Sequence, residues 1–133
     1  MLDGAAERSV RVATIGERLG ALRLCAPETV VSVRRSLERD GQLAAVALFA
    51  VADGVEMIDG FKRLRAARDL GWEAVRAHVL DVDVVGAKLA IVQMHERTGL
   101  TEMEEAWLVR SLYRADGLSQ PVIAARLRRH KSW

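Results

Sequence analysis

The sequence predicts an α+β protein: a small mixed sheet with flanking helices in residues 1–83, followed by an all-helical subdomain in residues 84–133. Three observations predict this fold class. Short runs of β-branched and small apolar residues alternate with helical patterns in the first part. The second part contains helical patterns alone. The composition, 50% hydrophobic and 29% charged residues, is that of an ordinary globular domain.

The first part reads as helix, strand, turn, strand, helix and strand after a short first strand or extended entry at Val10–Ile15. Pro27 suits the first position of a helix, and Gly41 suits its end. Asp53-Gly54 is typical of a hairpin turn between two strands. The predicted ranges are 27–40 and 61–70 for the helices, and 43–51, 55–58 and 75–80 for the strands.

The helical part begins near Val84, and its first helix is predicted over residues 84–96. Asp81 and Asp83 could form a metal pair, but carboxylates before a helix are favoured by its dipole, so we expect helix caps instead. Thr101 and Glu104 have the spacing of a capping box. That second helix is expected to end near Gly117, before a third helix.

A strongly basic helix follows directly on Asp59 and Gly60. Free backbone N–H groups and the positive end of the helix dipole meet at such a junction, so it can hold a phosphate. The spacing alone leaves a second interpretation open, a solvated helix face whose basic side chains lie over the sheet. The anion could be a nucleoside triphosphate or the DNA backbone.

The segment Asp59–Ala67 resembles the phosphate-binding motif of the ParB family of partition proteins, usually Gly-Glu-Arg-Arg-x-Arg-Ala. Phe61 stands where that motif has Glu. The related sulfiredoxin enzymes place a catalytic Cys in this turn, which is missing here. The resemblance favours the phosphate-site interpretation. The positions that match the motif, identically or by a conservative change, are Gly60, Lys62, Arg63, Arg65 and Ala66.

The surrounding segments follow the order of the same family, from about Val10 to Trp133. Arg39-Asp40-Gly41 fits the family's first motif. Residues 93–97 lie where the family has Glu-Asn-x-Gln-Arg, with Arg97 as the match. Residues 100–106 are similar to its Leu-x-Pro-x-Glu-Glu-Ala, and residues 118–127 are similar to the first helix of its helix-turn-helix.

The resemblance implies a clamp that depends on CTP with Mg²⁺ and binds a DNA site, in plasmid or chromosome partition or in transcription regulation. Phe61, Gln93 and Met94 depart from the family where its Glu and Asn help to bind Mg²⁺, and Phe and Met offer no oxygen ligand. We therefore expect binding rather than catalysis, with no catalytic or metal residue. The implied nucleotide- or phosphate-binding residues are Gly41, Gly60, Lys62, Arg63, Arg65 and Arg97.

The C-terminal segment is basic, with no Asp or Glu from Leu118 to Trp133. It predicts a helix over 119–127, a tight turn and the start of a second helix. The base-reading residues would lie beyond Trp133, so we expect the chain to be a fragment of a longer protein. Cations in this segment would contact DNA phosphates. The predicted DNA-binding residues are Ser119, Gln120, Arg126, Arg128, Arg129 and Lys131.

Two other functions stay open. One is a nucleotide-hydrolysing enzyme, a CTPase or nuclease, that uses the Gly60 turn. The other is a homodimer formed through the helices from Val84 onward. A single cysteine, Cys25, cannot form an internal disulfide, and neither a signal peptide nor an apolar run of membrane-spanning length is present. We expect a cytoplasmic protein with no membrane partner.

Overall fold

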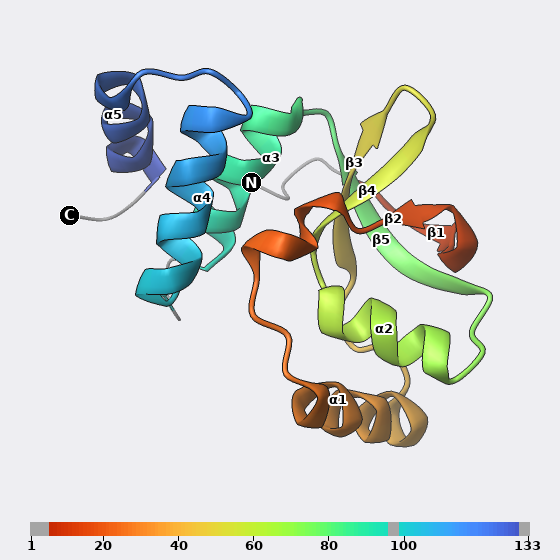
Figure 1. The fold of residues 1–133 in the computed structure, drawn as a ribbon. Helices are drawn as coiled ribbons and strands as arrows, with labels where there is room; N and C mark the ends of the chain where they lie inside the picture. Colours follow the sequence, from red (N-terminus) through yellow and green to blue (C-terminus); the bar gives the residue numbers. More distant parts are fainter. Residues whose placement is uncertain (1–5, 96–98, 131–133) are drawn as a thin grey trace. The chain divides into compact units, whose positions relative to one another are not determined.

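A computed structural model describes residues 6–95 and 99–130, with side chains up to residue 127 in the last helix (Figure 1). The chain divides into two compact units. One ends at Asp81 and the other begins at Val82. The first unit holds the sheet and two α-helices, and the second holds three α-helices.

The sheet has five strands in the order β1-β5-β3-β4-β2. β3 pairs antiparallel with β4 and parallel with β5, so the sheet is mixed, as predicted. β1 pairs antiparallel with β5, and β2 pairs parallel with β4. The strand bounds are Glu7–Arg11 for β1, Ile15–Gly16 for β2, Val46–Val51 for β3, Gly54–Asp59 for β4 and Ala74–Leu80 for β5.

One strand prediction was wrong in detail. The apolar run predicted as a strand from Leu43 forms β3 only from Val46, and Leu43 is 76% exposed. The carbonyls of Ala44 and Ala45 accept hydrogen bonds from a side chain, which holds this segment outside the sheet. The segment predicted as a short first strand or extended entry at Val10–Ile15 contains the end of β1 and the start of β2, which lie on opposite edges of the sheet and are joined by a 3-10 turn.

Two helices of the first unit pack against each other (Figure 1). α1 spans Pro27–Asp40 and ends at Gly41, whose φ of 71° suits a glycine. α2 spans Phe61–Asp69, one residue shorter than predicted. The core of this unit contains large side chains with almost no exposure, among them Leu48, Met57, Ile58 and Leu64.

The helical unit consists of α3 (Val84–Met94), α4 (Glu102–Arg114) and α5 (Gln120–His130). The predicted capping box of α4 is present in both directions, between Thr101 and Glu104. Asp83 caps α3 by accepting a hydrogen bond from the Gly86 N–H at 2.7 Å, as expected from the sequence. Within the described residues, each helix is too short or too polar to cross a membrane.

Candidate phosphate-binding site

The turn between β4 and α2 is built on Gly60. Its φ of 113° lies in the left-handed region, where a side chain is unfavourable. A Cβ at this position would also lie 2.5 Å from Cγ1 of Val46. Both the backbone conformation and the packing therefore require glycine at this turn.

Gly60 is the N-cap residue of α2, and no side chain caps this helix start. The Leu64 N–H donates the first intrahelical bond to the Gly60 carbonyl, at 2.9 Å. The N–H groups of Phe61, Lys62 and Arg63 precede it and have no acceptor within the helix. These groups and the positive end of the helix dipole together favour an anion.

Phe61 belongs to the core and not to the surface of the turn. Its side chain is buried, with the residue 5% exposed, and its ring faces Gly20, where an added Cβ would lie 3.5 Å from a ring carbon. The departure from the family's Glu thus replaces a polar group by a packing residue. A carboxylate at this position would be buried against η2, the 3-10 helix Arg18–Leu22.

Arg63 joins the turn to the chain that precedes β3. One terminal nitrogen of its guanidinium donates to the carbonyls of Ala44 and Ala45, at 2.7 and 3.2 Å. The other lies 3.7 Å from the Asp59 carboxylate. Arg63 therefore has a structural role at the turn, in addition to the phosphate contact predicted for it.

Arg65 is held by a carboxylate of the same unit. Its Nε lies 3.3 Å from Glu17, and Glu17 also forms an ion pair with Arg68. Arg68 donates further to the Ile15 carbonyl at 2.7 Å. These arginines fix α2 to the segment around β2.

Lys62 is the remaining cation of the first turn of α2. It is half-buried, and it makes no ion pair or side-chain hydrogen bond with any residue in 6–95 or 99–130. Its charge is therefore not neutralised by a described neighbour. Lys62 is the cation of this turn best placed to meet a ligand.

The other two predicted phosphate residues are Gly41 and Arg97. Gly41 ends α1, where its N–H donates to the Leu37 carbonyl at 2.9 Å. Arg97 lies outside the described residues. Gln93 and Met94, which depart from the family's Glu and Asn, are the last two residues of α3 in the other unit.

Three polar residues of the first unit carry no periodic signal and were missed by sequence reasoning. Arg23 lies in the connection before α1, with a guanidinium nitrogen 3.9 Å from the Asp59 carboxylate. Glu17 pairs with the arginines of α2. Glu56 is buried in β4, where its carboxylate accepts the Arg18 N–H at 2.9 Å. An acid within an apolar strand was the one signal that could have drawn attention to Glu56.

The predicted DNA-binding segment forms α5. The Ser119 hydroxyl accepts the Val122 N–H at 3.4 Å at its start, next to the exposed Gln120, and Arg126 is half-buried. The tight turn predicted after Leu127 is not present, because α5 continues through Arg128 and Arg129 to His130. The structure describes the backbone but not the side chains of these two arginines, and Lys131 lies outside the described residues.

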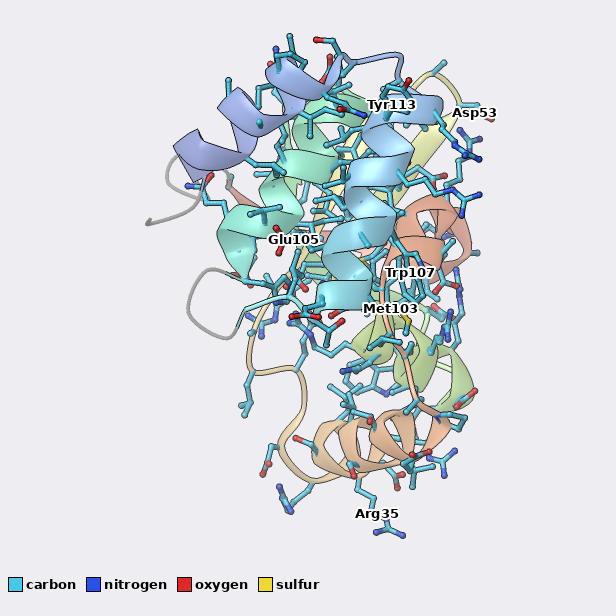
Figure 2. The ribbon with its side chains drawn as sticks, turned by 60° about the vertical axis from the view of Figure 1, so that its left-hand side comes forward. Arg35, Asp53, Met103, Glu105, Trp107 and Tyr113 are labelled. Carbon is cyan, nitrogen blue, oxygen red and sulfur yellow. The ribbon has the colours of Figure 1, made fainter. Side chains whose placement is uncertain are left out.

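An apolar groove runs beside α4 and α5, with a volume of about 750 Å³. Val109, Tyr113, Ile123 and Leu127 contribute to its lining. Figure 2 shows Tyr113 near the C-terminal end of α4, and Met103 and Glu105 near its beginning.

Among curated proteins, the chain is 30% identical over 108 residues to the nucleoid occlusion protein of Oceanobacillus iheyensis. This match covers 79% of the chain and 38% of the relative, so the chain spans well under half of that protein. No family model matches the chain.

Solved structures share the fold. The C-terminally truncated chromosome-partitioning protein ParB from Caulobacter crescentus, complexed with CTP-γ-S, aligns with a TM-score of 0.62 at 21% identity, over 96% of this chain and 72% of that one. The same protein complexed to the centromeric parS site aligns with a TM-score of 0.57 at 19% identity, over 90% and 64%. The sequence likeness to a nucleoid occlusion protein and the fold shared with ParB structures support a ParB-like family for this chain.

Proposed function

We propose that this chain binds a nucleoside triphosphate at the Gly60 turn and DNA through its helical unit, as part of a ParB-like protein of partition, nucleoid occlusion or transcription control. The observation that carries the proposal is the start of α2. Among the described residues, it combines a helix N-terminus without a side-chain cap, a glycine that its backbone and packing require, and the charge of Lys62 without an ion-pair partner. Phosphate oxygens are the natural acceptors for such a group of donors.

CTP is the first nucleotide to test, because a structure with this fold was solved with a CTP analogue. In this proposal the first-turn N–H groups hold a phosphate, and Lys62 supplies a point charge beside them. Arg63 keeps the segment at Ala44 and Ala45 against the turn. The backbone donors would bind any triphosphate, so selection of the base has to come from other residues.

The DNA-binding half of the proposal rests on the basic α5 and on the nature of the relatives. One relative is named a nucleoid occlusion protein, and one structure with this fold was solved with its parS site. Arg and Lys contacts to phosphates give affinity that weakens as salt rises, without sequence choice. Arg126 is the described cation of this helix.

Hydrolysis of the nucleotide was the alternative predicted from sequence, and the described residues do not favour it. Phe61 is a core residue with no oxygen to offer. The burial of Phe61 therefore supports binding without turnover as the function we propose.

Calorimetric titration of CTP, ATP, GTP and UTP in Mg²⁺ buffer tests the nucleotide site. We expect binding by the wild type and a loss of at least about tenfold in affinity for Lys62→Ala, because one desolvated charge contact is removed. Arg35→Ala is the matched control, since Arg35 projects outward from α1 (Figure 2) and is exposed. Equal affinities for the two variants, or no binding of any triphosphate, would overturn the proposal.

A further inference from the structure

Asp59 directly precedes Gly60 in the turn, and its carboxylate lies between two guanidinium groups. It is the last residue of β4 and directly precedes the N-cap of α2. Its carboxylate is 3.7 Å from a nitrogen of Arg63 and 3.9 Å from a nitrogen of Arg23. With its side chain 30% exposed, this carboxylate is within reach of solvent and of a ligand.

The position of Asp59 places a negative charge where a bound phosphate would bring its own. The positive end of the α2 dipole favours any anion at this place, and a carboxylate of the chain already benefits from it. Two anions within a few ångströms of each other repel, most strongly where solvent screening is reduced. A bound phosphate and the Asp59 carboxylate therefore compete for the positive electrostatic field at the start of α2.

We propose that Asp59 is an internal counter-anion of the Gly60 turn, which a bound phosphate has to displace from Arg63 and Arg23. This inference rests on the proposed function, because it assigns an autoinhibitory contact to the same site. Displacement frees the two guanidinium groups to face the ligand. Asp59 thereby lowers the affinity of the resting turn for phosphate groups.

The contacts of Arg63 explain why the site survives the loss of this carboxylate. One terminal nitrogen stays bonded to the carbonyls of Ala44 and Ala45, and the other faces Asp59. When the carboxylate is neutralised, the first nitrogen still holds the guanidinium in place. The second then meets an incoming phosphate without a competing charge.

The test compares Asp59→Asn with wild type by calorimetric titration of CTP and of inorganic triphosphate, at one fixed salt concentration. We expect Asp59→Asn to bind both ligands about tenfold more tightly, because the repulsion between one carboxylate charge and the phosphate is removed at close range. Asp53→Asn is the matched control. It makes the same charge change at the tip of the β3–β4 hairpin (Figure 2), and we expect less than a twofold effect.

Asp59→Ser is a second variant, in case the amide perturbs folding, because a small hydroxyl group also removes the charge at this position. It should bind both ligands more tightly as well, and circular dichroism melts of all variants check the fold. If wild type binds and neither variant is tighter than Asp53→Asn, the counter-anion inference is wrong while the triphosphate site stands. If wild type and both Asp59 variants all fail to bind, the triphosphate site and the counter-anion are both rejected.

Discussion

Lys88 of α3 and Asp116, in the connection between α4 and α5, form a buried ion pair. Only 4% and 8% of the two side chains are exposed. On α3, Lys88 stands between Ala87 and Leu89, and both of these residues are buried. A lone charge in such surroundings is strongly unfavourable, so each residue depends on the other. The pair ties the α4–α5 connection to α3.

Asp116→Asn leaves the Lys88 charge buried without its partner. We expect the free energy of unfolding of the helical unit to fall by about 3 to 5 kcal/mol, measured by urea denaturation. The double variant Lys88→Met with Asp116→Leu should recover most of this loss, because apolar residues of similar volume replace the pair.

Asp69→Asn serves as the control for that experiment, because it breaks an exposed ion pair. Asp69 pairs with Arg34, and the Asp69 and Arg34 side chains are 51% and 38% exposed. The loss of this ion pair should lower the free energy of unfolding by less than about 1 kcal/mol. An Asp116→Asn variant that is no less stable than Asp69→Asn would show that the buried ion pair contributes no more to stability than the exposed one.

Gly60→Ala should destabilise the first unit by at least about 2 kcal/mol, from backbone strain and from the clash with Val46. Gly41→Ala is a matched control, because Gly41 also has a positive φ, of 71°, but nothing lies within 4 Å of an added Cβ. The free energy of unfolding of Gly41→Ala should fall by about 1 kcal/mol, from backbone strain alone. Thermal and urea unfolding of both variants measure the difference, and equal losses would contradict the packing argument.

Phe61→Glu restores the family's acid but places a charge in the core. We expect a loss of several kcal/mol in unfolding free energy and no gain in Mg²⁺-dependent binding of CTP. Phe61→Leu keeps the site apolar and should lose only about 1 to 2 kcal/mol. A Phe61→Glu protein that is as stable as wild type and binds CTP more tightly with Mg²⁺ would place residue 61 in the site instead of the core.

DNA binding through α5 has a signature in its salt dependence. For a long nonspecific duplex, Arg126→Ala should reduce the slope of log K against log salt by about 1, the change expected for one lost phosphate contact. Arg110→Ala removes an equal charge from the exposed surface of α4 and should leave the slope unchanged. Fluorescence anisotropy over a range of salt measures both, and identical slopes for the two variants would argue against α5 as the contact.

The elements that the sequence predicted well are those with local signals. Pro27, Gly60 and the Thr101–Glu104 box mark helix ends through their own backbone and side chains, and each stands where it was predicted. The mixed sheet followed from the order of strands and helices. The basic turn at Gly60 was found because glycine and cations are adjacent in sequence.

The features that the sequence could not predict depend on residues far apart in the chain. Arg63 holds the carbonyls of Ala44 and Ala45, directly before the start of β3 at Val46. Lys88 meets Asp116 across 28 positions, without any periodic pattern. The end of α5 is a different case, because its signal is local: α5 continues past Leu127 since Arg and His are compatible with a helix, and neither Gly nor Pro stands in residues 128–130.

The central claim is that the free N–H groups at the start of α2 hold phosphate. A titration of ¹⁵N-labelled protein with CTP, followed by two-dimensional NMR, observes these groups directly. We predict the largest amide shifts at Gly60, Phe61, Lys62 and Arg63, because hydrogen bonds to phosphate oxygens form there. Saturable binding with shifts confined to other residues, or no shifts at millimolar CTP, would contradict the claim.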